Sequence, residues 1–277
     1  MDRRTFLTSA VAASVFPLTF DGIAEARTLK TIGLQLYTVR FALRKDIEGT
    51  LAKVAAIGYR EVEFAGDFDE PPNAVRAMLD RQGLTAPSAH VDYSVVEKKW
   101  SQSIERGHAL GHKYLICSDI DEKQRALPDG WKRAAELFQR AGEAGQKAGI
   151  QFGYHNHTFE FQPDKSLGGK LPYDFLLVET DPHLVKMEMD LCWITEGGQD
   201  PLTYFHRYPG RFPLVHVKDI TKDHHMTEVG SGAINWKRIL ADSDEAGIKH
   251  YIVEHDEPAS PFESIRTSYE YLRKLEF

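Results

Sequence analysis

Histidine or carboxylate residues occur in six short segments of the sequence, each at the end of a β-rich run. Neutral imidazoles and carboxylates together suit Mn²⁺, Zn²⁺, Fe²⁺ or Co²⁺, whereas Ca²⁺ prefers oxygen ligands alone. Buried charges of this kind are costly unless a cation neutralises them. These residue types therefore predict metal-assisted chemistry. The six segments are Glu61–Phe64, Ser88–His90, Tyr154–His157, Glu188–Asp190, His216–Asp219 and Glu254–Asp256.

Short β-rich runs alternate with longer stretches of helical periodicity from Thr31 onward. Trp131, Ala134 and Phe138, for example, are spaced so that they share one helix face. Eight such runs with helices between them predict an α/β fold, a closed (β/α)8 TIM barrel. The predicted strands cover residues 32–37, 61–64, 85–89, 114–117, 151–155, 184–189, 214–217 and 251–254, and the last helix covers 262–275.

Glycine stands just before five strands, at Gly58, Gly83, Gly111, Gly149 and Gly247. Each position suits the residue after a helix, which often needs a positive φ angle. An open doubly wound sheet is the alternative, but it usually carries a glycine-rich phosphate loop after its first strand. The corresponding residues 36–40 have no glycine, and no linker divides the chain. We predict one barrel domain over residues 27–277.

The first 26 residues differ in composition from the rest of the chain. Arg3 and Arg4 precede an apolar run over residues 7–20, which is followed by Ala24–Ala26. This order is typical of a twin-arginine-type signal peptide with a small-residue cleavage site. The alternative is a basic N-terminus with a chance apolar run. The first interpretation predicts a periplasmic or secreted protein that begins near residue 27.

The overall composition excludes several classes of protein. The chain of 277 residues has a net charge of −7, which argues against a nucleic-acid partner. Beyond the N-terminus no apolar stretch approaches the roughly 20 residues of a membrane span. Cys117 and Cys192 are too few for a disulfide framework or a thiolate zinc site, and we expect free, buried thiols. The oligomeric state does not follow from the sequence.

Active sites of such barrels form where strands end and the following loops begin. Polar residues at the ends of predicted strands 5 to 8 therefore predict one shared site. Glu61 is expected on the strand face opposite Glu63, in a structural role. Glu188 has the same expected relation to Asp190, and His250 is expected at the surface.

Five motifs together carry a resemblance to a known family. They are Gly33–Arg40, Gly58–Glu63, Tyr154–His157 with Phe159–Phe161, His216–Asp219, and Gly230–Gly232 ahead of Ile234–Trp236. As a set they resemble the sugar phosphate isomerase/epimerase family of the xylose isomerase-like barrel superfamily. The resemblance covers essentially all of residues 27–277.

The resemblance implies a divalent metal, Mn²⁺ or Zn²⁺ first, with Fe²⁺, Co²⁺ or Mg²⁺ as alternatives. Its implied ligands are His155, Asp190, His216 and Glu254. The sugar epimerases of this superfamily usually carry glutamate at the first of these positions. There it forms an acid/base pair with the glutamate of strand 8, so His155 removes one member of that pair. His157 is the alternative ligand from strand 5.

The implied activity is that of a sugar isomerase or epimerase. Such an enzyme removes a proton next to a carbonyl that the metal binds. Glu254, Glu160 and His157 are the candidate bases. Lys218 either stabilises the developing oxyanion or forms an ion pair with Asp219 or Glu254. The candidate substrate-binding residues are Gln35, Arg40, Glu63, His90 and Trp193.

The substrate class and the reaction leave alternatives open. The chain has no obvious Arg/Lys phosphate clamp, and sugar phosphates are mainly cytoplasmic, so an unphosphorylated sugar, keto-sugar or glycoside is expected. One alternative is metal-dependent lyase or hydrolase chemistry on a glycoside or keto-glycoside. A second is a non-catalytic periplasmic sugar-binding protein, against which the clustered His, Asp and Glu argue.

Overall fold

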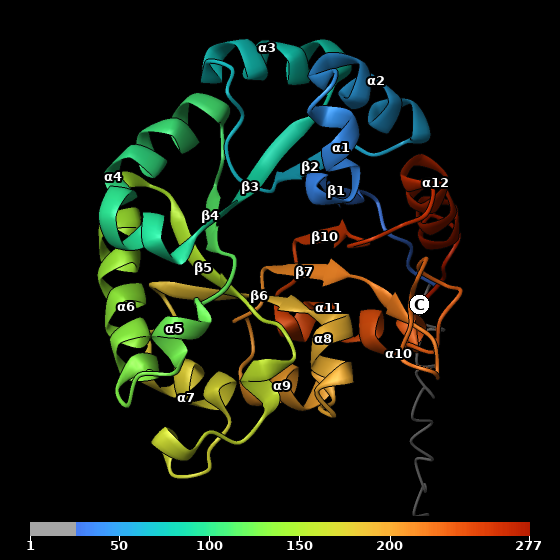
Figure 1. Cartoon of the computed structure of the whole chain (residues 1–277). Coiled ribbons are helices and arrows are strands. Elements are labelled where there is room, and N and C mark those ends of the chain that lie inside the picture. The colour runs from blue at the N-terminus through green and yellow to red at the C-terminus, as the bar shows by residue number, and fades with distance from the viewer. Residues whose placement is uncertain (1–25) are drawn as a thin grey trace, which may run out of the picture.

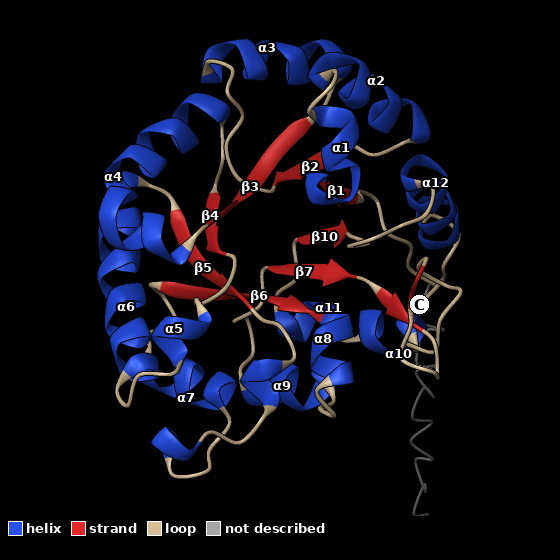
Figure 2. Cartoon of the chain, viewed as in Figure 1, coloured by secondary structure: helices blue, strands red, loops and turns tan. Residues whose placement is uncertain are grey.

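The computed structural model describes residues 26–277 and contains eight parallel strands closed into a barrel within a ring of helices (Figure 1 and Figure 2). Around the barrel the strands follow the order β1, β10, β7, β6, β5, β4, β3, β2, which confirms the predicted fold. The predicted signal peptide lies outside the described residues, apart from its last residue. The barrel strands are β1 Gly33–Gln35, β2 Glu61–Phe64, β3 Thr85–Val91, β4 Tyr114–Cys117, β5 Gln151–His155, β6 Val185–Asp190, β7 Leu214–Val217 and β10 His250–Val253.

The strand bounds agree closely with those predicted. β2, β4, β5 and β7 match at both ends, and β6 and β10 are displaced by one residue. β1 is shorter than predicted because the chain turns into a 3-10 helix at Leu36–Val39. Gln35 stabilises this turn, since its side-chain oxygen accepts a hydrogen bond from Tyr37 N at 3.2 Å.

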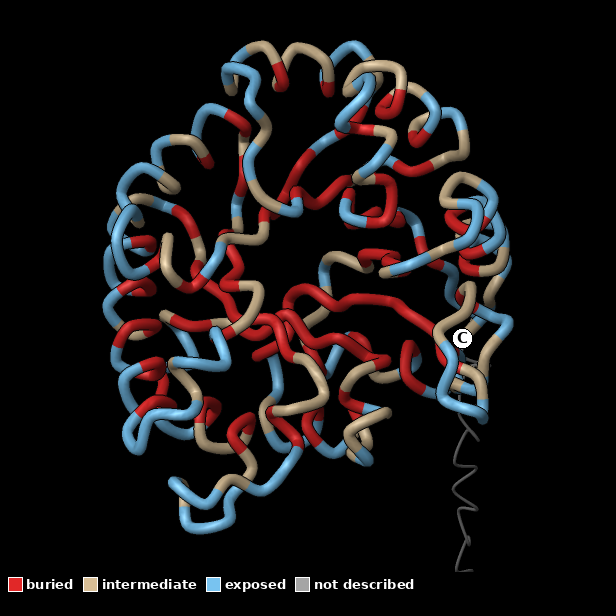
Figure 3. Tube along the Cα trace, in the orientation of Figure 1, coloured by how far each residue is buried: buried red, intermediate tan, exposed pale blue. Residues whose placement is uncertain are grey.

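The helices cover the outside of the barrel with their apolar faces. In α6, for instance, Trp131, Ala134, Phe138 and Ala141 are all buried, and the helix packs against β5. Figure 3 shows the same division, with buried strands and helices exposed on their outer sides. No helix in the described part of the chain is long and apolar enough to cross a membrane. The helices are α1 Arg40–Leu43, α2 Ile47–Ile57, α3 Pro72–Gln82, α4 Tyr93–Leu110, α5 Glu122–Arg125, α6 Gly130–Ala148, α7 Pro172–Glu179, α8 Leu191–Glu196, α9 Pro201–Arg207, α10 Trp236–Ala241, α11 Ser243–Ala246 and α12 Pro261–Leu272.

The five glycines predicted to end helices all have positive φ angles, from +64° at Gly83 to +133° at Gly58. At Gly58 the neighbours add a second constraint, because a Cβ atom there would collide with the ring of Tyr269. The predicted alternation of helix, glycine and strand is therefore confirmed.

The loop after β7 is held by one buried carboxylate. It contains a small antiparallel pair, β8 Asp219–Ile220 and β9 Met226–Thr227. The Asp219 carboxylate accepts hydrogen bonds from Gly230 N at 2.9 Å, Gly232 N at 3.3 Å and Trp236 Nε1 at 2.8 Å. Asp219 thus fixes the glycine motif as a turn that leads into α10.

Alternate residues of the strands project into the barrel and form layers, because strand side chains repeat with a period of two. On β7 the inward series is Leu214, His216 and then Lys218 just beyond the strand. The apolar side chains of Ile116, Leu214 and Ile252 pack together. Toward the N-terminal ends of the strands, His250 Nδ1 lies 2.9 Å from Glu61 Oε2. The expectation that His250 is a surface residue was wrong, since it lies in this partly buried pair.

Candidate metal and active site

A cavity of about 740 Å³ opens at the C-terminal ends of the strands. The predicted residues that line it are His90, His155, His157, Lys218 and Glu254. Asp92, Ser118, Asp119 and Asp256 add further polar groups. The cavity therefore lies where the barrel fold places active sites, and its lining suits a polar, hydroxyl-rich molecule.

Three of the four predicted metal ligands form the upper cluster: Asp190, His216 and Glu254. Their candidate ligand atoms all lie within 4.8 Å of one another, and the three residues are buried. His216 Nδ1 is 3.0 Å from Glu254 Oε2 and 3.9 Å from Asp190 Oδ2. The fourth predicted ligand, His155, has its Nε2 3.7 Å from Asp190 Oδ2.

Asp190 presents one oxygen to the cluster and uses the other to begin a helix. Its Oδ1 accepts hydrogen bonds from Cys192 N and Trp193 N, both at 2.9 Å, and so caps α8. Its Oδ2 is buried and faces the Lys218 ammonium, whose Nζ lies 3.1 Å away. Two buried carboxylates and an imidazole whose ligand atoms lie within 4.8 Å of one another are the donor set that suits a divalent cation. The residues present therefore fit the predicted metal.

Lys218 lies buried among three carboxylates. Its Nζ is 2.6 Å from Glu254 Oε2, 2.9 Å from Asp256 Oδ1 and 3.1 Å from Asp190 Oδ2. Burial alone would lower the pKa of Lys218, but these carboxylates raise it well above its usual value. Lys218 is therefore an ammonium group and forms the ion pair with Glu254 that was one predicted alternative. It also reaches the cavity, so a role toward a substrate oxygen remains available.

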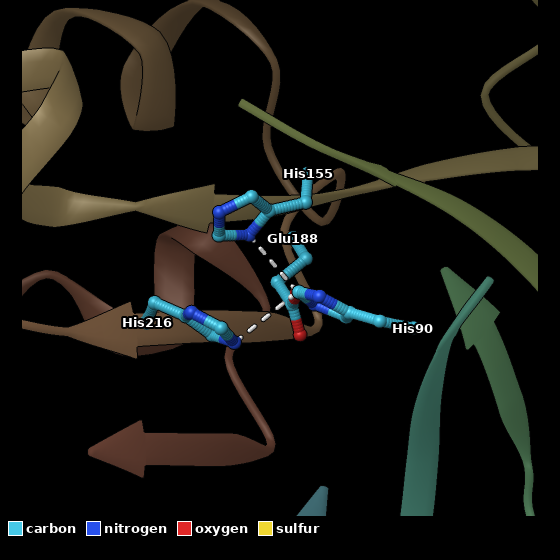
Figure 4. A group of neighbouring side chains, drawn as sticks. All are labelled: His90, His155, Glu188 and His216. Carbon is cyan, nitrogen blue, oxygen red and sulfur yellow. Dashed lines mark hydrogen bonds and ion pairs between the residues drawn. The ribbon is translucent and has the colours of Figure 1, made fainter. Parts of the chain in front are cut away.

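Beneath the upper cluster lies the deep cluster, formed by His90, His155, Glu188 and His216 (Figure 4). Glu188 Oε2 is 2.7 Å from His90 Nε2, 3.1 Å from His155 Nδ1 and 3.3 Å from His216 Nε2. The expectation that Glu188 lies on the strand face opposite Asp190 was wrong, and so was the same expectation for Glu61 and Glu63. Residues two apart in a strand share a face, so Glu188 points into the barrel together with Asp190.

Glu63 and Gln35 lie next to the deep cluster. Glu63 Oε1 accepts a hydrogen bond from Gln35 Nε2 at 2.8 Å and lies 2.7 Å from His216 Nε2. Both residues are fully buried and do not line the cavity. We therefore assign Gln35 and Glu63 to the support of His216 and His90, instead of the predicted contact with substrate hydroxyls.

The charges of the deep cluster balance one another. Burial alone would lower the pKa of His90, but Glu63 and Glu188 raise it to about 10. Burial and the Glu63 carboxylate raise the pKa of Glu188 to about 7. Burial together with the other imidazoles lowers the pKa of His155 well below its usual value. The cluster thus combines a neutral imidazole with paired charges.

His157 and Trp193 form one wall beside Lys218. Burial and the Lys218 ammonium lower the pKa of His157 to about 3, so this imidazole is neutral. Its Nδ1 has no hydrogen-bond partner and is buried. The Trp193 ring stacks near His157 with 6.4 Å between the ring centres, and its centre lies 5.2 Å from Lys218 Nζ. Trp193 therefore packs against residues that line the cavity.

Glu160 and Arg40 also lie outside the cavity. Glu160 is buried, and its carboxylate accepts hydrogen bonds from Tyr154 Oη and, at 2.9 Å, from His157 N. We assign Glu160 to positioning His157 instead of the predicted role as a base. Arg40 Nη1 donates to Asp256 O at 2.7 Å and joins two loops of the rim. It lines a neighbouring groove of about 870 Å³.

Glu188 and Asp256 belong to this region but were not among the predicted site residues. Their positions in the sequence pointed to the site, because Glu188 lies two positions from Asp190 and Asp256 lies two positions from Glu254. Side chains two apart along a strand point the same way. This rule applied to β6 identifies Glu188, whereas Asp256 lies in the loop beyond β10, which ends at Val253.

Comparison with known proteins supports the same family. A family model for the xylose isomerase-like TIM barrel matches residues 51–275. Inosose dehydratase from Lacticaseibacillus casei is 25% identical over 267 residues, which cover 81% of this chain and 88% of the relative. Inosose dehydratase from Geobacillus kaustophilus is 25% identical over 272 residues, with coverages of 81% and 86%.

Solved structures show the same likeness. A sugar phosphate isomerase/epimerase from Parabacteroides distasonis superposes with a TM-score of 0.77 and 29% identity, over 92% of this chain and 97% of that one. The IolI protein with a bound zinc atom has a TM-score of 0.69 over 87% and 95% of the chains, but its 13% identity shows the fold alone. The predicted resemblance is confirmed, and the chain belongs to the xylose isomerase-like TIM barrel family.

Proposed function

We propose that this protein is a metal-dependent enzyme that removes a proton from the carbon next to a carbonyl group of a sugar or keto-sugar. Isomerisation or epimerisation is the proposed outcome. The observation that carries the proposal is the upper cluster, whose Asp190, His216 and Glu254 converge within 4.8 Å beside a polar cavity. The family of the chain agrees with this activity.

The upper cluster residues would hold the cation, with His155 as a further candidate ligand. When bound, such a cation supplies Lewis-acid stabilisation of negative charge on a carbonyl oxygen. Glu254 lines the cavity as an ionised group, because Lys218 and His216 outweigh burial and hold its pKa well below the ordinary value. An ionised carboxylate at this place can accept the substrate proton.

Lys218 and His157 complete the proposed chemistry. The Lys218 ammonium lies 2.6 Å from Glu254 Oε2 and stabilises negative charge that develops on a nearby oxygen. His157 is neutral and has an unpartnered Nδ1, so it can hydrogen-bond to a substrate hydroxyl. Proton return from the opposite face then falls to a water molecule, because His155 replaces the usual glutamate and His157 is neutral.

A second candidate function is elimination of water from the same kind of substrate. The curated relatives named inosose dehydratase favour it. Elimination shares the first step, proton removal next to a carbonyl, and then requires a donor for the departing hydroxyl group. Lys218 is a permanent donor within the cavity and fits that role. One site therefore supports either outcome, and product analysis separates them.

Deuterium exchange tests the shared step. The purified protein, loaded with Mn²⁺ or Zn²⁺, is incubated in D₂O with a panel of free sugars, keto-sugars and glycosides, and exchange at carbon is followed by NMR. We expect exchange next to the carbonyl of at least one panel member, and a loss of at least about 100-fold in Glu254→Gln. An isomeric product supports isomerisation, whereas loss of water supports elimination.

Glu61→Gln is the matched control, because Glu61 is a glutamate of the barrel interior that pairs with His250 away from the cavity. It should retain the wild-type exchange rate. Absence of exchange with every panel member, or equal rates in Glu254→Gln and the wild type, would contradict the proposed function.

A further inference from the structure

We propose that the deep cluster is a second divalent-cation site, made by His90, His155 and Glu188 together with the far nitrogen of His216. It lies beneath the upper cluster, and it goes beyond the proposed function, which requires one cation only. Four observations carry this proposal: the spacing of the ligand atoms, the unpartnered carboxylate oxygens, the charge of the two clusters and the orientation of His216.

The spacing of the ligand atoms is that of a coordination shell. Three imidazole nitrogens lie 2.7, 3.1 and 3.3 Å from Glu188 Oε2, and the four atoms are within 4.8 Å of one another. Ligand atoms around one tetrahedral Zn²⁺ are about 3.3 Å apart, given Zn–N distances of about 2.0–2.1 Å. The separations within the deep cluster, from 2.7 Å to at most 4.8 Å, lie on both sides of this value.

Two carboxylate oxygens at this place are buried and accept no hydrogen bond: Glu188 Oε1 and Glu63 Oε2. Buried carboxylate oxygens without a donor are costly and call for an explanation. Both belong to carboxylates that contact His90 and His216. An ion in the deep cluster gives these oxygens a partner.

The charges of the two clusters leave room for two divalent cations. Five carboxylates meet here around the Lys218 ammonium, so with the imidazoles deprotonated, as metal binding requires, four negative charges remain among these carboxylates and Lys218. One divalent ion in the upper cluster balances two of them, and a second in the deep cluster balances the other two. The five carboxylates are those of Glu63, Glu188, Asp190, Glu254 and Asp256.

His216 connects the two clusters through opposite nitrogens of its ring. Its Nδ1 lies 3.0 Å from Glu254 Oε2 in the upper cluster. Its Nε2 lies 2.7 Å from Glu63 Oε1 and 3.3 Å from Glu188 Oε2, on the side of the deep cluster. A nitrogen that binds a cation carries no proton. With both sites filled, His216 would bind both ions as an imidazolate, which adds one negative charge to the four, and its ring protons would be released to solvent.

Protons provide the competing account of the deep cluster. Two protons, on His90 and His216, balance the same two negative charges as one divalent ion. A protonated network binds no metal, whereas the proposed site binds one equivalent beyond the upper cluster. The metal content of matched variants therefore decides between the two accounts.

The test is zinc stoichiometry. The purified protein is stripped with a chelator, loaded with excess Zn²⁺ and desalted, and zinc per chain is measured by mass spectrometry. We expect two equivalents in the wild type and in the Glu61→Gln control. Glu188→Gln should retain one equivalent, held by the upper cluster, and Asp190→Asn should retain one, held by the deep cluster.

Anomalous diffraction from zinc-loaded wild-type crystals provides a readout that does not depend on how the variants fold. A peak between His90, His155 and Glu188 supports the proposal. A single peak beside Asp190 and Glu254, or one equivalent of zinc that Glu188→Gln retains, overturns it and leaves the proposed function intact. Zinc lost in Glu188→Gln but not in Asp190→Asn supports the deep site and contradicts the proposed function.

Discussion

At the scale of single residues, this barrel buries several ionisable side chains whose pKa values differ from the usual ones. Glu160 shows the effect apart from the two clusters. It is fully buried beneath the loop that follows β5, and burial raises its pKa to about 8. Its hydrogen bonds to Tyr154 and to His157 N position the loop that presents His157 to the cavity.

Glu160 predicts a pH dependence of stability. Its pKa is raised from 4.5 to about 8 on folding, so the folded protein binds the proton more tightly than the unfolded chain does. This tighter proton binding stabilises the folded protein by at most about 5 kcal/mol. The stabilisation is complete below pH 4.5 and is lost as the pH rises to about 8. Glu160→Gln keeps an acceptor but does not titrate, so its free energy of unfolding should fall less between pH 5 and pH 8.

Urea unfolding at pH 5, 6.5 and 8 measures this difference. The control is Glu122→Gln, in the short helix α5, where the glutamate is exposed. The control should show the wild-type slope with pH. Equal slopes for Glu160→Gln and the wild type would show that Glu160 does not titrate in this range.

At the scale of elements, the glycine that ends a helix determines where the chain turns toward the next strand. Gly58 ends α2 with a φ angle of +133°, and Gly83 ends α3 with +64°. The two positions differ in their surroundings. A Cβ atom at Gly58 would collide with the Tyr269 ring of α12, whereas one at Gly83 would have no atom within 4 Å.

These two glycines form a matched pair of substitutions. Gly83→Ala should lower the free energy of unfolding by about 1 kcal/mol, the cost of the backbone conformation alone. Gly58→Ala should cost roughly 3 kcal/mol or more, since the displacement of Tyr269 adds to that cost. Denaturant unfolding of both variants measures the difference. A smaller loss in Gly58→Ala than in Gly83→Ala would show that Tyr269 moves away freely.

At the scale of the whole molecule, the closed barrel brings together side chains that are far apart in the sequence. Glu63 and His216 are 153 positions apart, yet Glu63 Oε1 lies 2.7 Å from His216 Nε2. The closed strand order also determines the polarity of the barrel, with the cavity at the C-terminal strand ends. Helices cover the outside of the strands, so access to the site is through the loops of that end.

We propose that the chain is exported by the twin-arginine route, on the strength of its first 26 residues. Arg3→Lys combined with Arg4→Lys should hold the protein in the cytoplasm of a bacterial host, at the size of the uncleaved chain. Arg27→Lys, beyond the proposed cleavage site, is the control and should be exported like the wild type. Fractionation and mass measurement test this, and export of the double variant would contradict the proposal.

The sequence by itself determined the barrel and the position of its polar end. Hydrophobic periodicity and the glycines that end helices are local signals, so the strands were predicted within a few residues. The ligand candidates Asp190, His216 and Glu254 followed from their positions at strand ends, together with the resemblance to a family. The signal for Glu188 was also local, but its strand face was assigned incorrectly.

Only the tertiary structure decided which of these side chains share a contact. The barrel separates Glu160 from the cavity and places Gln35 and Glu63 beneath it. Strand stagger and loop packing determine how far below the cavity each side chain lies. It also turns the two nitrogens of His216 toward different clusters. Depth, ring orientation and the meeting of five carboxylates around Lys218 depend on long-range packing, which local spacing in the sequence does not encode.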